Sequence, residues 1–377
     1  MKDYKTENLR NICLLGHSGA GKTSIGEAML FNTGVLDRFG KVDDGTTTLD
    51  YDSEEIKRKI SISAAIGPCD WNNIRINVVD TPGYFDFVGE VVSSLYVCDG
   101  AVIAVDSVSG VEVGTEKAWD MVCEEGLPSM FFINKMDREN ANFSKVYEQL
   151  REVFGNKLVP IAIPIGAESN YKGVIDLIDM KAKLHEGNKV VEKDIPSGYE
   201  DQIEEFRSMI IEAAAQTDEE LMEKYFSGEE LTKDEIIKGL KLGVVTGDTV
   251  LVLCGSALKN SGVVALMNAI ENFFPSPIET DGYTVKDLKT DKEETRKYDT
   301  NLPLSIKVFK TVADPFVGKI SIFKVMSGFV TADSEVYNTN KEKKERLSGL
   351  FLLRGKKQIP MTKLVAGDIG AVAKLQY

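Results

Sequence analysis

The stretch GHSGAGKT, residues 16–23, constrains the fold of this chain more than any other. It follows the apolar run NICLLG and precedes the helix-like pattern SIGEAMLFN, so it connects a strand to a helix. Glycines in such a loop let backbone N–H groups converge on phosphate oxygens, and the N-terminus of the helix adds partial positive charge. We therefore expect a phosphate-binding loop made by Gly16, His17, Ser18, Gly19, Ala20, Gly21, Lys22, Thr23 and Ser24.

Apolar runs of strand length recur after this loop and alternate with helical patterns. Nearly continuous hydrophobicity indicates strands that are buried on both faces, as in a parallel sheet. The expected strands are residues 11–16, 74–80, 100–106, 129–135 and 249–257, and the expected crossover helices are residues 115–125 and 144–154. The pattern predicts an α/β domain of the P-loop NTPase kind, with a mostly parallel, doubly wound sheet.

The alternation of strand and helix patterns changes at several points, and these points divide the chain into parts. Residues 1–280 would form the nucleotide-binding domain, and the more charged residues 158–250 within it would form an inserted α+β subdomain. Residues 281–301 are polar and predict a linker. Residues 302–377 contain short, regularly spaced strand patterns, which favour an all-β barrel. The sequence stops directly after a strand-like run, so we expect an N-terminal fragment of a longer protein.

Composition narrows the class of protein. The net charge of −14 disfavours DNA binding, which requires a basic surface. The five cysteines lack a C-x-x-C pair, which predicts free thiols in a reducing compartment. No secretory signal and no stretch long enough to span a membrane are evident in the sequence. We expect a cytoplasmic monomer that does not bind membranes.

A second motif, DTPG at residues 80–83, follows another buried strand. The Asp80 carboxylate can hold Mg²⁺ directly or through water, as Thr23 would do with its hydroxyl. Gly83 offers a backbone N–H to the terminal phosphate, and Thr81 and Pro82 complete the turn. Lys22 would reach the outer phosphates from the loop, so Lys22 and Gly83 are candidate catalytic groups.

A third motif, NKMD at residues 134–137, indicates which base is bound. The Asp137 carboxylate can accept two hydrogen bonds from guanine that adenine cannot supply, and Asn134 and Lys135 would support it. The segment containing Ser256, Ala257 and Leu258 would close over the base with its backbone. The order of the three motifs predicts GTP or GDP as ligand, with Mg²⁺, rather than ATP.

With these motifs in order, the chain resembles the translational GTPases, and within them elongation factor G. The resemblance includes NKMDRENANF, YKGVIDLIDMKAK in the insert, CGSALKNSGV, and DPFVGKISIFKVMSG in the expected barrel. It implies a GTP-binding domain with its insert, then a barrel that docks on small-subunit ribosomal RNA. It also implies that the GTP-binding domain meets the factor-binding region and a stalk protein of the large subunit. A complete factor of this family carries three further domains, so this chain alone is not expected to catalyse complete translocation.

Four positions near the expected chemistry depart from the family pattern and favour a specialised paralogue. Gly19 replaces a usual Asp, Lys59 replaces a Gly, and Ser61 stands where a Thr hydroxyl contacts Mg²⁺. Tyr84 stands where the family has a His that positions the attacking water. Tyrosine is a poor base at neutral pH but still donates and accepts hydrogen bonds, and a neutral side chain suffices in other GTPases. Two readings therefore stay open: a ribosome-stimulated GTPase, and a GTP-dependent ribosome-binding switch with little turnover.

Two charged regions also allow two readings each. The acidic residues 200–230 could be a docking face for the stalk protein or a solvated helical face. The basic residues 340–357 could contact RNA phosphates or form a charged hairpin tip. The isolated aromatics are expected to pack in the core or between domains; they are Phe31, Phe39, Trp71 and Phe316.

Overall fold

The computed structural model describes residues 2–186, 189–287, 290–315 and 317–376. Phe316 lies outside the described residues. The centre of the molecule is a seven-stranded sheet with the order β2-β3-β1-β4-β5-β11-β6. All neighbouring pairs are parallel except β2 and β3. The strands are β2 (Ala65–Trp71), β3 (Ile74–Asp80), β1 (Leu9–Gly16), β4 (Gly100–Asp106), β5 (Ser129–Asn134), β11 (Val250–Cys254) and β6 (Leu158–Pro160).

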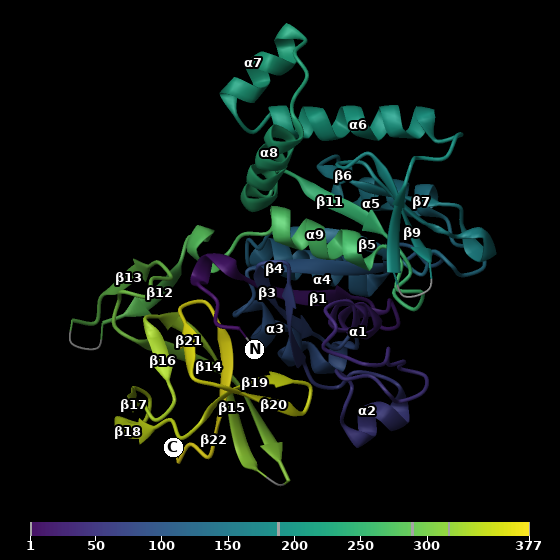
Figure 1. The fold of residues 1–377 in the computed structure, drawn as a ribbon. Helices are drawn as coiled ribbons and strands as arrows, with labels where there is room; N and C mark the ends of the chain where they lie inside the picture. The colour runs from purple at the N-terminus through teal and green to yellow at the C-terminus, as the bar shows by residue number, and fades with distance from the viewer. Residues whose placement is uncertain (1, 187–188, 288–289, 316, 377) are drawn as a thin grey trace.

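Helices cover both faces of this sheet, as the buried strands require (Figure 1). The helix α1 packs against α9, and α3 and α4 pack against β1. These covering helices are α1 (Lys22–Asn32), α3 (Val88–Leu95), α4 (Val113–Glu124), α5 (Phe143–Phe154) and α9 (Val263–Phe273). The predicted doubly wound α/β fold is confirmed, with β2 and β6 as the strands of the central sheet that sequence patterning missed.

The register of the sheet aligns the ends of the strands that carry the motifs. Leu14 pairs with Asp80, and Asp106 pairs with Asn134, across neighbouring parallel strands. The phosphate loop, the DTPG turn and the NKMD turn therefore leave the sheet at the same edge, as expected for ligand sites of open α/β sheets.

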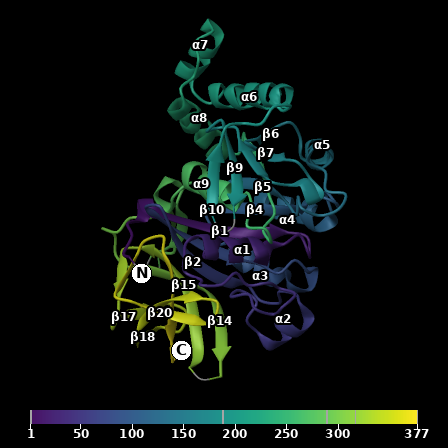
Figure 2. The ribbon, with the colours of Figure 1, turned by 45° about the vertical axis from the view of Figure 1, so that its right-hand side comes forward.

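The segment between β6 and β11 contains a separate layer of structure. The strands β7 (Ala162–Ile165), β8 (Gly173–Asp176), β9 (Lys181–Glu186) and β10 (Lys189–Lys193) form an antiparallel sheet. Three helices follow, α6 (Glu200–Ala215), α7 (Glu219–Ser227) and α8 (Lys233–Thr246). Figures 1 and 2 place α7 at the end of the molecule farthest from the C-terminal strands. The segment predicted as an α+β insert thus contains both strands and helices, whereas β6, which falls within the predicted bounds of 158–250, belongs to the central sheet.

The C-terminal part is all-β. Its five-stranded antiparallel sheet contains β14 (Ser305–Asp314), β15 (Gly318–Ser327), β22 (Ile369–Ala373), β19 (Leu350–Arg354) and β20 (Lys357–Met361). Two short ladders join β16 (Phe329–Thr331) to β21 (Lys363–Val365) and β17 (Glu335–Asn338) to β18 (Lys343–Arg346). Phe323, Val325, Leu350, Leu352 and Val372 are central to its apolar core. The preceding polar segment, predicted as a linker, contains the hairpin of β12 (Tyr283–Lys286) and β13 (Glu293–Arg296).

Buried polar groups join the two parts at the amino-terminal halves of β1 and β3 and the start of β4. Lys324 Nζ lies 2.7 Å from Asp99 Oδ1, and Arg75 Nη1 lies 2.9 Å from Asp368 Oδ2. Asn11 and Asn77 connect these pairs through hydrogen bonds of 2.6–3.1 Å. These contacts hold the C-terminal sheet against the sheet edge opposite to the motifs, while Lys310 and Gly355 also contact Ala64 and Ile66 at the motif edge. Within the described residues no helix combines the length and apolar character needed to cross a membrane.

Two of the isolated aromatics pack against one another, as expected. Phe31 and Phe39 make an edge contact with ring centroids 5.7 Å apart. Trp71 is partly buried against the central core, and its Nε1 donates to Asn268 Oδ1 at 3.0 Å.

Candidate functional site

The phosphate loop connects β1 to α1 in a conformation that favours glycine. Gly19 and Gly21 have φ angles of 81° and 96°, which side chains with a Cβ rarely adopt. A Cβ on Gly16 would lie 2.3 Å from the carbonyl oxygen of Ala104, so the loop is also closely packed against β4. The loop backbone is therefore fixed where α1 begins, as an anion cradle requires.

Lys22 is the first residue of α1, and its side chain folds back onto this loop. Its Nζ donates to the carbonyl oxygens of Gly16 and His17 at 3.0 and 2.9 Å. Burial lowers the pKa of Lys22 to about 8, although the nearby carboxylates of Asp80 and Asp50 partly oppose that shift. An ammonium group that has lost much of its hydration is well prepared to pair with an anionic phosphate.

A cavity of about 430 Å³ opens at the carboxyl ends of β1, β3 and β5. The three predicted motifs, residues 42–61 and the loop after β11 all contribute to its wall. The lining residues predicted from the sequence are Ser18, Gly19, Gly21, Lys22, Thr23, Ser24, Ser61, Gly83, Tyr84, Asn134, Lys135, Asp137, Ser256 and Leu258. The structure thus brings together groups that lie up to 240 residues apart, since Ser18 and Leu258 share one wall.

The other predicted residues support this wall from behind. Thr81 Oγ1 donates to the carbonyl oxygen of Leu14 at 2.6 Å, which ties the DTPG turn to β1. The carbonyl oxygen of Ala20 accepts from Asn134 Nδ2 at 2.9 Å, and the N–H of Ala257 donates to Asn134 Oδ1 at 2.9 Å. Asn134 therefore fastens the phosphate loop to the loop after β11. Gly16, His17, Asp80 and Pro82 likewise lie outside the lining.

The groups predicted to hold Mg²⁺ converge. Thr23 Oγ1 and Ser61 Oγ are 3.1 Å apart, and Thr23 lies beside the Asp80 carboxyl and favours its ionised form. Asp80 Oδ1 is buried without a hydrogen-bond partner. Burial, followed by the charge of Asp50, raises the pKa of Asp80 to about 8. A buried oxygen without a partner beside two hydroxyls is an oxygen donor set that fits Mg²⁺.

The NKMD turn presents its side chains in different directions. Lys135 has a φ of 67°, and its Nζ lies 2.6 Å from Asp106 Oδ2. Asp137 lines the cavity beside Ser256 and Leu258. Asn134 and Lys135 thus brace the turn, and Asp137 contributes to the wall of the cavity.

Tyr84 lies at the mouth of the cavity with 44% of its surface exposed. Gly83 before it is pressed against the phosphate loop, because a Cβ there would lie 2.5 Å from Lys22 Nζ and 2.8 Å from the Ser18 nitrogen. The two histidines lie elsewhere. His17 Nδ1 accepts from the N–H of Gly114 at 3.2 Å, and His185 lies on β9 of the insert. Of these three side chains, Tyr84 lines the cavity and His17 and His185 do not, which makes Tyr84 the candidate for positioning a water.

Sequence reasoning missed a set of acidic residues on α1 and on the segment that connects α1 to β2. Asp50 lines the cavity, and burial raises its pKa to about 6, although nearby Ser61 partly opposes that shift. Glu27 on α1 accepts from the N–H of Thr48 at 2.9 Å and holds the loop in place. Glu55 on α2 (Ser53–Arg58) is 2% exposed. The loop has no hydrophobic periodicity, so nothing in the sequence pattern marked these positions.

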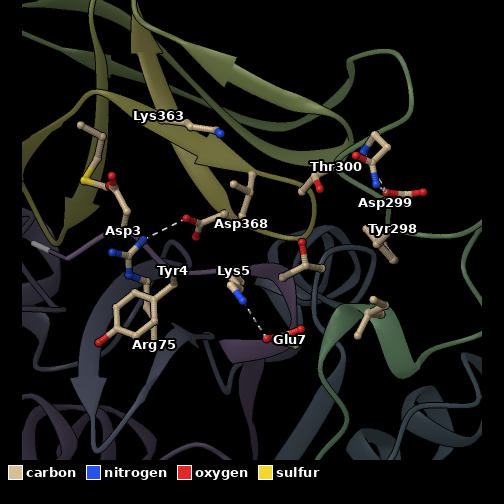
Figure 3. Close-up of a pocket in the computed structure, with 15 residues that line it drawn as sticks. Asp3, Tyr4, Lys5, Glu7, Arg75, Tyr298, Asp299, Thr300, Lys363 and Asp368 are labelled. Atoms are coloured by element: carbon tan, nitrogen blue, oxygen red, sulfur yellow. Dashed lines mark hydrogen bonds and ion pairs between the residues drawn. The ribbon is translucent and has the colours of Figure 1, made fainter.

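A second cavity, of about 520 Å³, lies at the seam between the N-terminal segment, β3 and the C-terminal sheet (Figure 3). Its charged groups are largely engaged with one another. Arg75 pairs with Asp368, and Lys5 Nζ lies 3.6 Å from Glu7 Oε1. It lacks the glycine-rich backbone of the first cavity, so we assign the nucleotide chemistry to the cavity at the phosphate loop.

Comparisons with known proteins agree with this geometry. Residues 7–276 match the family Elongation factor Tu GTP binding domain, and residues 303–377 match Elongation factor G domain 2. A crystal structure of a protein from Thermus thermophilus is similar over 97% of this chain, with a TM-score of 0.86 and 32% identity. This chain spans 52% of that one, about half its length. The chain therefore belongs to the translational GTPases of the elongation factor G type and carries their guanine-nucleotide-binding domain.

Proposed function

We propose that this protein binds GTP together with Mg²⁺ and hydrolyses it on the ribosome, as part of a step of protein synthesis such as translocation. The observation that carries the proposal is the convergence of three sets of groups on one cavity of about 430 Å³. These sets are the phosphate loop with Lys22, the oxygen donors near Asp80, and the base-recognition turn with Asp137.

Each set has a separate role in the proposal. Residues 16–24 hold the phosphates through backbone N–H groups, and Lys22 exchanges its two carbonyl partners for phosphate oxygens. Thr23, Ser61 and Asp80 would hold Mg²⁺, which when bound neutralises charge on the phosphates. Asn134, Lys135, Asp137 and the loop from Ser256 to Leu258 would hold guanine.

Tyr84 and Gly83 would orient the attacking water. Gly83 places its N–H beside the phosphate loop because the turn approaches Lys22 and Ser18 closely. The Tyr84 hydroxyl can donate and accept a hydrogen bond, and phosphoryl transfer relies more on positioning and charge stabilisation than on early proton abstraction. Hydrolysis is therefore compatible with tyrosine where the family has histidine.

The test is single-turnover GTP hydrolysis with and without ribosomes, alongside equilibrium binding of GTP, GDP and ATP. We expect GTP and GDP to bind far more tightly than ATP, and ribosomes to accelerate hydrolysis by orders of magnitude. Tight GTP binding with turnover that stays slow on ribosomes would instead favour the second candidate function. That candidate is a GTP-dependent binding switch that acts by occupying the ribosome.

The ribosomal contacts also belong to the proposal. The C-terminal sheets would meet small-subunit RNA through the basic residues 340–349 with Lys356 and Lys357. Arg354 does not belong to that surface, because it is buried and donates to the carbonyl oxygen of Pro68. Lys344 and Arg346 there already pair with Glu335 and Asp333 at 2.8 and 3.0 Å, which reduces the net positive charge.

The GTP-binding domain would meet the large subunit, with the stalk protein on the acidic helices of the insert. On α7 the Phe226 side chain is 78% exposed beside Tyr225 at 41%, which offers an apolar anchor within an acidic surface. Loss of stalk binding in a Phe226→Ala variant, with unchanged GTP affinity, would support this contact. We further propose the boundaries 1–280, 281–301 and 302–377 for the domains, and a cytoplasmic location.

A further inference from the structure

Three consecutive backbone amides directly after Ser61 are each held by a carboxylate. The N–H groups of Ile62 and Ser63 donate to Glu55 Oε1 at 2.9 and 3.0 Å. The N–H of Ala64 donates to Glu90 Oε2 at 2.7 Å. Hydrogen bonds to an ionised acceptor are about twice as strong as neutral ones, so this peptide segment is firmly placed.

The two carboxylates come from different elements. Glu55 lies on α2, within the same loop region as Ser61, and its Oε2 also accepts from the N–H of Asp52 at 3.1 Å. Glu90 lies on α3, the helix that follows the DTPG turn and Tyr84. The segment after Ser61 is therefore fastened both to its own loop and to the helix beyond the proposed water site.

A lysine from the C-terminal sheet completes the arrangement. Lys310 on β14 donates to Glu90 Oε2 at 2.5 Å and to the carbonyl oxygen of Ala64 at 2.7 Å. The Lys310 side chain is 9% exposed and that of Glu90 is 30% exposed, so water screens this ion pair less than an exposed one. Ala64 thus has its N–H held by Glu90 and its carbonyl oxygen held by Lys310.

We propose that Glu90 and Lys310 are positioning residues for the Ser61 hydroxyl, and that through them the C-terminal sheet controls the metal site. The inference rests on the proposed role of Ser61 toward Mg²⁺. Ser61 Oγ lies 3.1 Å from Thr23 Oγ1. This distance depends on the backbone position of the three residues that follow Ser61. Glu90 and Lys310 fix the far end of that segment, and Lys310 is the contribution of the second domain.

The second domain touches the same region at another point, which explains why its position matters there. The N–H of Gly355, in the turn between β19 and β20, donates to the carbonyl oxygen of Ile66 at 2.9 Å. A Cβ on Gly355 would lie 2.1 Å from the carbonyl oxygen of Thr48. The C-terminal sheet therefore lies against both the start of β2 and the loop before α2. A shift of this sheet would change the position of Ser61.

The test measures the Mg²⁺ concentration at which a fluorescent GTP analogue binds half-maximally, in the full chain. We expect Lys310→Met and the double variant Glu90→Gln/Lys310→Met to raise this midpoint by about tenfold, as loss of outer partners does at metal sites. The matched control is Lys319→Met, which removes an exposed lysine from the neighbouring strand β15 and should leave the midpoint unchanged. The double variant removes both charges, so neither is left unpaired in a partly buried place.

A Ser61→Ala background separates positioning from general destabilisation. If Lys310 acts through Ser61, Lys310→Met should add less than about twofold to the midpoint of Ser61→Ala, because the two changes then affect one interaction. Thermal unfolding of the nucleotide-free variants shows whether each is folded. An unchanged midpoint in Lys310→Met, or an undiminished effect in the Ser61→Ala background, would overturn the inference. An unchanged midpoint in Ser61→Ala alone would show that the proposed metal role of Ser61 is wrong, and the inference would fall with it.

Discussion

Replacement of Lys324 tests how the second domain is held against the first. Lys324 and Asp99 are 1% and 5% exposed, and their charged atoms are 2.7 Å apart. Removing one member of such a pair leaves a buried charge without its partner, which costs about 3–5 kcal/mol of the free energy of unfolding. We expect a loss of this size for Lys324→Met, and a smaller loss than the sum of the single effects for Lys324→Met/Asp99→Asn.

The assay is urea unfolding followed by far-UV circular dichroism at neutral and alkaline pH. Burial opposes the charged form of Lys324, but Asp99 and Tyr298 outweigh it and raise the pKa of Lys324 above 10.5. The stabilisation by this pair should therefore be complete below pH 10.5 and disappear as pH rises through the higher pKa of the folded state. Single variants that cost less than about 1 kcal/mol, as exposed ion pairs do, would refute the reasoning.

Two further predictions concern the phosphate loop and the insert. Gly83→Ala should weaken GTP binding by about tenfold in a titration, because its Cβ would lie 2.7 Å from Ser18 Cα. The control Gly89→Ala should not weaken binding, because there is open space around Gly89. Equal GTP affinities of the two variants would contradict this prediction. In the insert, Lys224 and then Thr232 lower the pKa of Glu235 to about 2. The stability that Glu235 adds should be complete above pH 4.5 and vanish as pH falls through 2, so the difference in thermal unfolding between native protein and Glu235→Gln should vanish there. A difference that does not change with pH would contradict this assignment.

Much of the site was predictable because its motifs are local. The loop of residues 16–23, the DTPG turn and the NKMD turn each combine a buried strand with a specific backbone requirement. Parallel pairing then places their ends together, as the pairing of Leu14 with Asp80 shows. Continuous hydrophobic runs predicted β3 and β4 with the observed bounds.

The remainder depends on contacts between distant segments. The strand β2 contains Gly67 and Pro68, which disfavour a strand in sequence patterning, yet it pairs along its whole length with β3. The strands β12 and β13 lie in a polar segment and are held by pairing with each other. Asp50, Glu55 and Glu90 acquire their roles only when the loop folds back on α1 and α3, which no local pattern reports.

The most direct measurement is single-turnover GTP hydrolysis on ribosomes by the native protein, Tyr84→Phe and Tyr84→His. The account predicts rapid hydrolysis by the native protein and a large loss in Tyr84→Phe, because the hydroxyl would position the water. Nucleotide affinity, measured in parallel, should be similar in all three. If the native protein stays slow while binding GTP tightly, and only Tyr84→His hydrolyses it rapidly, the protein is a binding switch and the proposed hydrolysis is contradicted.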